Sequence, residues 1–130
     1  MIKELIKPIL TERIRICDEL QDNWDDGIEK CWKKEIEILT NNLTETVHYF
    51  STECSDEDFY WISEVFEELI SITQYKEFIS IWNTRLSYIK PDNYKTENFK
   101  TLYIKNELNY EIFIEQIKKE IVYAEDYLDK

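Results

Sequence analysis

The fold class of this chain is decided by the stretch SDEDFYWISEVFEELI, residues 55–70. Ser55 is a favoured N-cap residue, and Asp58 three positions later makes an approximate capping box. The carboxylates of this first turn also interact favourably with the positive end of the helix dipole. Beyond them, residues at helical spacing form one face that we expect to be buried: Phe59, Ile62, Phe66, Leu69, Ile70 and Thr73. We therefore predict an amphipathic helix from residue 55 to about residue 73.

Composition extends the helical prediction to the rest of the chain. The 130 residues include one glycine and two prolines, which leaves little turn chemistry for a sheet of tight hairpins. Asn41–Asn42 is a candidate break between helices, and Pro91 is expected to stop a helix. Apolar residues recur at helical spacing in four further segments, about residues 2–21, 28–50, 74–89 and 109–128. We predict an all-α fold, a single-domain bundle (1–130) of about five amphipathic helices.

Residues 90–106 do not fit this pattern, and we predict that they are irregular. The segment alternates basic and aromatic side chains: Lys90, Tyr94, Lys95, Phe99, Lys100, Tyr103 and Lys105. Such an alternation can bind single-stranded nucleic acid through base stacking and phosphate contacts. The acidity of the whole chain argues against that function. We expect a loop that packs its aromatic residues inward, and no direct binding of nucleic acid.

Nothing in the sequence indicates a membrane segment. No stretch approaches the roughly 18 apolar residues of a membrane span, and residues 1–20 lack the pattern of a secretory signal peptide. With 43% hydrophobic and 15% aromatic residues, the chain is also too apolar for a disordered acidic tail. We therefore expect a folded cytoplasmic protein that does not bind membranes.

The charge of the chain is concentrated in one window. The chain has 28 acidic and 16 basic residues, a net charge of −12. Residues 35–75 contain no lysine or arginine, yet ten carboxylates lie there: Glu35, Glu37, Glu45, Glu53, Asp56, Glu57, Asp58, Glu64, Glu67 and Glu68. A surface of one sign steers an oppositely charged partner and raises its rate of association. The window indicates a basic partner, and general acidity for solubility is the alternative.

The sequence offers little support for catalysis or for a bound cofactor. One glycine cannot build a glycine-rich phosphate loop, because such a loop needs several positions free of side chains. Glu45 and His48 have the Glu-x-x-His spacing of di-iron bundles, but a di-iron site needs a second histidine and the chain has only one. The cysteines, at positions 17, 31 and 54, match neither a disulfide framework nor a zinc site and are expected to be buried thiols. We predict no catalytic residue, no metal, no cofactor and no enzyme activity, although a cysteine paired with the histidine stays open.

The outer face of the predicted helix over residues 55–73 makes the sharpest case for function. Tyr60 and Trp61 lie opposite the buried positions, where exposure to water disfavours large rings. Aromatic residues inside a charged rim are typical of an interface hot spot. In the alternative, Trp61 packs under another helix, so that this helix is buried on two sides. For Glu64, Glu67 and Glu68, the separate alternative is an ordinary solvated face. The candidate contact set is Glu57, Tyr60, Trp61, Glu64, Glu67 and Glu68.

A family resemblance begins at these residues. The stretch over residues 55–70, the short turn at Thr73–Gln74 and the helix that begins with Lys76-Glu77-Phe78-Ile79 resemble the small helical immunity proteins encoded beside bacterial polymorphic toxins, including those of contact-dependent growth inhibition. The resemblance covers about residues 53–90. It implies that the chain binds one cognate toxin, often a nuclease, and covers its active site or its nucleic-acid surface. Members bind different toxins, so the resemblance assigns no contact residue.

Two binding functions follow from these observations. The first is an immunity protein that neutralises a cognate toxin, with the basic C-terminal toxin domain as partner. The second is an acidic regulatory or anti-defence protein that imitates nucleic acid, which requires carboxylates spaced like phosphates along one surface. The oligomeric state is not readable from the sequence.

Overall fold

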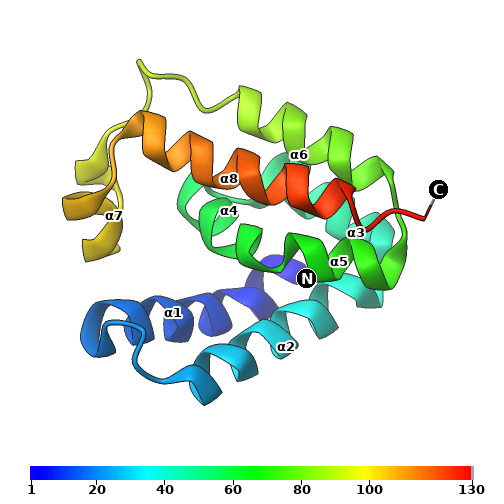
Figure 1. The fold of residues 1–130 in the computed structure, drawn as a ribbon, viewed down its shortest axis with the longest axis horizontal. Coiled ribbons are helices and arrows are strands. Elements are labelled where there is room, and N and C mark those ends of the chain that lie inside the picture. Colours follow the sequence, from blue (N-terminus) through cyan, green and yellow to red (C-terminus); the bar gives the residue numbers. More distant parts are fainter. Residues whose placement is uncertain (130) are drawn as a thin grey trace.

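The computed structural model describes residues 1–129 and confirms the predicted all-α fold (Figure 1). No helix of these residues is both long enough and apolar enough to cross a lipid bilayer. The helical elements follow one another as α1 (Ile2–Leu20), α2 (Asp25–Asn41), α3 (Leu43–His48), the π-helical turn η1 (Tyr49–Glu53), α4 (Asp56–Ile62), the 3₁₀ turn η2 (Ser63–Val65), α5 (Phe66–Thr73), α6 (Glu77–Ser87), the 3₁₀ turn η3 (Thr96–Asn98), α7 (Leu102–Glu107) and α8 (Tyr110–Glu125).

The α4–η2–α5 rod occupies the centre of the bundle. In Figure 1, α1 and α2 form one layer, and α6 and α8 lie on the opposite side of the rod. The rod contacts α1 and α2 through α4 and α5, and it contacts α8 through η2 and α5. A helix in this position has two covered faces, whereas an ordinary surface helix has one.

An aromatic cluster fills the core against the inner face of the rod. Phe66 and Trp82 are fully buried, and their rings stack with centroids 3.7 Å apart. Phe78 stacks on the other side of Trp82 at 5.2 Å, and Phe50 meets Phe66 and Trp82 edge-on. Aromatic pairs of this kind add about 0.5–1.5 kcal/mol beyond the area that they bury. The inner face predicted from the sequence is confirmed for Phe59, Ile62, Phe66, Leu69 and Ile70.

Local capping signals set the starts of α3 and α4. Ser55 caps α4 as predicted, because its Oγ accepts a hydrogen bond from the amide of Asp58 at 3.1 Å. The break at Asn41–Asn42 is confirmed, since Asn42 is extended and its Oδ1 accepts from the amide of Glu45 at 3.1 Å. The predicted helix over residues 28–50 is therefore α2, α3 and η1 in succession.

The predicted helix over residues 55–73 is interrupted, which the sequence pattern did not indicate. Residues Ser63–Val65 form a 3₁₀ turn, and Val65 has φ −107° and ψ 8°. The hydroxyl of Ser63 donates to the carbonyl of Tyr60 at 2.5 Å. A serine hydroxyl that bonds to the preceding turn offers the backbone an alternative to the regular helical ladder. The interruption divides the predicted helix into α4 and α5, with Glu64 in the turn between them.

The prediction of an irregular segment over residues 90–106 is correct up to Thr101 and wrong for α7. The carboxylate of Asp18 accepts hydrogen bonds from the amides of Leu102 and Tyr103, at 3.1 and 3.3 Å, and so caps the start of α7. The cap comes from α1, more than 80 residues away, which local sequence reading cannot detect. Phe99 is buried against Phe113, as an inward-packing loop requires.

Candidate binding groove

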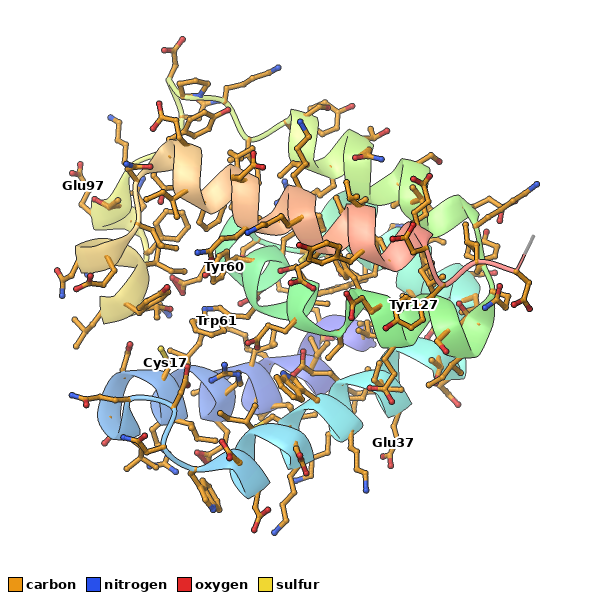
Figure 2. The ribbon with its side chains drawn as sticks, viewed as in Figure 1. Cys17, Glu37, Tyr60, Trp61, Glu97 and Tyr127 are labelled. Atoms are coloured by element: carbon orange, nitrogen blue, oxygen red, sulfur yellow. The ribbon has the colours of Figure 1, made fainter. Side chains whose placement is uncertain are left out.

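Tyr60 and Trp61 are buried, so the prediction that they lie on an exposed outer face is wrong. Their exposed fractions are 8% and 3%, and Figure 2 shows both between α1 and α8. The ring of Tyr60 stacks on Phe113 with centroids 5.0 Å apart, and its hydroxyl bonds to Gln116. The indole of Trp61 donates to the hydroxyl of Thr101 at 3.3 Å. The alternative interpretation, a helix buried on two sides, is the correct one.

Glu57 is also not part of an exposed contact surface, because its side chain is 9% exposed and accepts hydrogen bonds from backbone amides. Its Oε2 accepts hydrogen bonds from the amides of Lys100 and Thr101, at 2.8 and 3.3 Å. This carboxylate therefore anchors the irregular segment that precedes α7. A charged acceptor for two amides stabilises more than a neutral one.

Glu64 is engaged inside the protein by Arg13 of α1. The guanidinium donates to both carboxylate oxygens of Glu64, at 2.9 and 2.8 Å, and a further nitrogen donates to Asp22 at 2.7 Å. Burial disfavours the charged form of Arg13, but the hydrogen bonds and charges of Glu64 and Asp22 outweigh it and raise its pKa. The same guanidinium lies 4.9 Å from the ring centroid of Trp61. Glu64 is thus occupied, although a quarter of its side chain is exposed.

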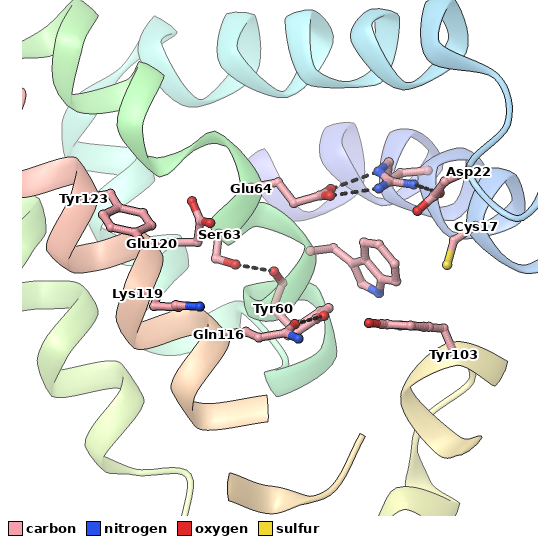
Figure 3. A pocket seen from close by; sticks show the side chains of 12 residues that line it. Cys17, Asp22, Tyr60, Ser63, Glu64, Tyr103, Gln116, Lys119, Glu120 and Tyr123 are labelled. Carbon is pink, nitrogen blue, oxygen red and sulfur yellow. Dashed lines mark hydrogen bonds and ion pairs between the residues drawn. The ribbon is translucent and has the colours of Figure 1, made fainter. Parts of the chain in front are cut away.

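A groove of about 450 Å³ opens beside this ion pair, between α1, the α4–η2 junction, α7 and α8. Its floor includes Tyr60 and Trp61, and Tyr103 of α7 and Tyr123 of α8 contribute two partly exposed rings. Figure 3 shows these side chains together with the charged ones, which are Arg13, Asp22, Glu64, Lys119 and Glu120. A second hollow of about 390 Å³ shares Cys17, Asp22 and Tyr103 with the groove and continues it along α1.

The groove contains a carboxylate without a cation. Glu120 forms no ion pair within residues 1–129, whereas Arg13 is shared by two carboxylates. Burial raises the pKa of Glu120, the negative charges of Glu67 and Glu64 raise it further, and the positive charge of Lys119 only partly opposes them. A cationic group near Glu120 would relieve this repulsion. The electrostatics of the groove therefore favour a positive ligand.

The groove borders a strip of acidic and aromatic side chains where α5 packs on α8. Gln74, the residue after α5, donates to the carbonyl of Tyr127 at 2.9 Å, and α5 packs on α8. The charge of Glu67 contributes to the raised pKa of Glu120, so Glu67 lies on the side of α5 near α8. Tyr123 and Tyr127 are 46% and 49% exposed, and Figure 2 places Tyr127 on the outside of the bundle. We name this strip the acidic seam and define it by Glu67, Glu68, Glu120, Tyr123 and Tyr127.

The six-residue contact set predicted from the sequence does not form one surface. Glu67 is partly exposed and Glu68 is exposed, so these two remain available. Sequence reading missed the α8 side of the seam. The signal was present, because Gln116, Glu120, Tyr123 and Tyr127 recur at helical spacing, but nothing in the sequence pairs that stripe with α5.

The histidine and the cysteines show no catalytic arrangement. His48 is exposed, and its Nε2 lies 3.2 Å from the hydroxyl of Thr52. Cys31 and Cys54 are buried as predicted, whereas Cys17 is only half-buried. Burial raises the pKa of Cys17 to about 11, with help from Asp22 and Asp18, so its thiol stays protonated at neutral pH. Among residues 1–129, no group of three or more histidine, cysteine or acidic side chains is placed to hold a metal ion.

No protein family model matches this chain, and no curated protein or solved structure in the comparisons is significantly similar to it. The resemblance to immunity proteins stays a prediction, and the function is inferred from the groove and the acidic seam.

Proposed function

We propose that this protein binds a basic protein through the acidic seam, and that the partner is a cognate bacterial toxin which it neutralises. The observation that carries the proposal is the seam itself. It includes three carboxylates, Glu67 and Glu68 of α5 and Glu120 of α8, and two half-exposed tyrosines, Tyr123 and Tyr127. Tyrosines surrounded by charged residues are typical of the anchors that dominate binding energy.

The charge distribution supports a basic partner. The window over residues 35–75 contributes no cation of its own to the seam. Lys119 is the nearest base in sequence to the seam residues on α8. A partner with a basic surface, such as a nuclease that presents lysine and arginine to phosphate, would meet a complementary potential. Binding there would cover the partner's basic surface, and no catalytic step is required of this chain.

The structure gives the nucleic-acid mimic less support. That function needs carboxylates repeated like phosphates along one surface. Several carboxylates of residues 35–75 are instead engaged inside the bundle. Glu35, Glu57 and Asp58 are buried, and Asp56 and Glu64 pair with arginines. Five of the ten carboxylates are therefore unavailable for such a repeat.

The test is co-expression with the C-terminal domain encoded by the gene immediately upstream. We expect the two proteins to co-purify and the domain to lose its toxicity. We also expect a variant with Glu67→Lys and Glu68→Lys to associate more slowly, by about tenfold at low salt, with a weaker dependence on salt. The control is the Glu29→Lys variant, which also carries Glu37→Lys so that its change in charge equals that of the seam variant. Both positions are exposed on α2, outside the seam.

Two results would contradict the proposal. If no upstream domain co-purifies, the immunity function fails. If a domain does bind but the seam variant and the Glu29→Lys control associate equally fast, binding uses another surface.

A further inference from the structure

The groove already holds the guanidinium of Arg13, and the contacts of this group show which chemistry the groove favours. Arg13 lies over the ring of Trp61 at 4.9 Å and donates in a fork to both oxygens of Glu64. A planar guanidinium is suited to this environment because it can stack on an aromatic ring while its donors meet a carboxylate. A lysine ammonium would form only one of these interactions well.

A carboxylate and an aromatic ring also occur together at the α8 end of the groove, but there the carboxylate has no ion-pair partner within residues 1–129. Glu120 and Tyr123 are three residues apart on α8, so their side chains are neighbours on one face of the helix, and both line the groove (Figure 3). Glu120 has no ion-pair partner among the described residues, and its nearest acidic neighbours are Glu67 and Glu64. Tyr123 is 46% exposed, which leaves its ring accessible.

Lys119 is the one feature of the lining that opposes a positive ligand at this end. It is exposed and makes no ion pair within residues 1–129. Because its side chain is long and solvated, it can move aside at a small cost. A cationic ligand would nevertheless bind better without it.

We infer that the groove receives an arginine side chain of the partner, whose guanidinium pairs with Glu120 and stacks on Tyr123. This inference rests on the proposed function and deepens it, since it names the group that the partner inserts beside the acidic seam. The groove continues at one end into the hollow along α1, so the arginine can be presented by an extended loop or tail.

A direct test uses a blocked Gly-Arg-Gly peptide as the probe and the same peptide with citrulline, the neutral isostere of arginine, as its control. The peptides are titrated into the ¹⁵N-labelled protein at low salt, and amide and indole signals are followed by NMR. We expect the arginine peptide to shift the amides of Glu120 and Tyr123 and the indole of Trp61. The citrulline peptide should shift them at least about fivefold less at equal concentration.

Two variants with opposite effects sharpen the test. Glu120→Gln should weaken the arginine peptide about fivefold, and Lys119→Gln should strengthen it about twofold. Glu111→Gln is the matched control, because Glu111 is exposed on the same helix and does not line the groove. Equal shifts with citrulline would overturn the inference, because they would mean that binding does not depend on the charge of the guanidinium. Equal weakening by Glu111→Gln and Glu120→Gln would overturn it too, because it would indicate only general attraction to an acidic protein.

The partner itself separates this inference from the proposed function. With a co-purified toxin domain, Glu120→Gln should mainly raise the dissociation rate, by about tenfold, whereas the seam charge reversal mainly lowers the association rate. If the domain binds and Glu120→Gln has no effect on dissociation, the arginine site is wrong and the binding function stands. If the peptide titration succeeds and no domain binds, the groove is correct and the immunity function is wrong.

Discussion

Replacing Glu35 with glutamine is expected to remove a strong pH dependence from the stability of this protein. Glu35 of α2 is fully buried, and neither carboxyl oxygen has a hydrogen-bond partner within residues 1–129. Burial raises its pKa to about 9, the negative charge of Glu64 adds to the shift, and Arg13 opposes it. The side chain is therefore protonated in the folded state at neutral pH.

The magnitude follows from the difference in proton binding between the folded and unfolded states. The unfolded chain loses this proton at its ordinary pKa of 4.5, whereas the folded state keeps it up to about pH 9. The free energy of unfolding of the wild type must therefore fall as the pH rises through this window. The slope is about 1.4 kcal/mol per pH unit, which amounts to at most about 4 kcal/mol at pH 7.5.

Glutamine has nearly the size and polarity of the protonated side chain but does not titrate. The Glu35→Gln variant should therefore match the wild type near pH 4.5 and exceed its free energy of unfolding by up to about 4 kcal/mol at pH 7.5. The assay is urea unfolding followed by circular dichroism and tryptophan fluorescence at several pH values from about 5 to 8. The informative quantity is the difference between variant and wild type, because the titrations of all other groups cancel in it.

Glu37→Gln is the control, since Glu37 lies on the same helix and is exposed. Its difference from the wild type should not change with pH. Parallel curves for the wild type and Glu35→Gln across this range would refute the reasoning, because they would mean that Glu35 is ionised in the folded state and finds a partner.

Two further changes test the interactions that hold the groove. Arg13→Met should lower the free energy of unfolding by about 3 kcal/mol in urea titrations, because it leaves the carboxylate of Glu64 without its cation; the double variant with Glu64→Leu should recover most of that loss. Glu57→Gln should cost about 1 kcal/mol and speed hydrogen exchange at the amides of Lys100 and Thr101, and unchanged exchange there would contradict the anchoring role of Glu57.

The fold was predictable as far as local signals reach. The cap at Ser55, the break at Asn42 and the inner face with Phe59 and Phe66 all depend on neighbours within one or two turns. Periodicity alone therefore located these helices. The 3₁₀ turn at Ser63 was missed because the apolar pattern continues through it and only the hydroxyl bond to Tyr60 reveals it.

The candidate site was less predictable, because it depends on contacts between distant segments. The exposure of Trp61 was misjudged since amphipathic spacing identifies one buried face, and a central helix has a second face covered by α1 and α8. From the sequence, Glu57 was likewise interpreted as a carboxylate of the first helical turn. In the structure it accepts hydrogen bonds from amides more than 40 residues later. Glu120 and Tyr123 were overlooked because nothing local connects them to the base-free window.

The central position of α4 and α5 also explains why the rod over residues 56–73 contains no base. Helices packed around this rod supply its cations, since Lys7 reaches Asp58, Arg13 reaches Glu64 and Arg85 reaches Asp56. A lysine or arginine within the rod would compete with these long-range pairs or would have to be buried itself. Much of the charge asymmetry therefore belongs to the architecture of the bundle. On α5, no internal cation of residues 1–129 pairs with Glu67 or Glu68, and Glu67 adds its negative charge to that of Glu120 where α5 packs on α8. This charge is not neutralised inside the described part of the protein, and the seam also contains two accessible tyrosines. We therefore assign binding to the seam and not to the whole of residues 35–75.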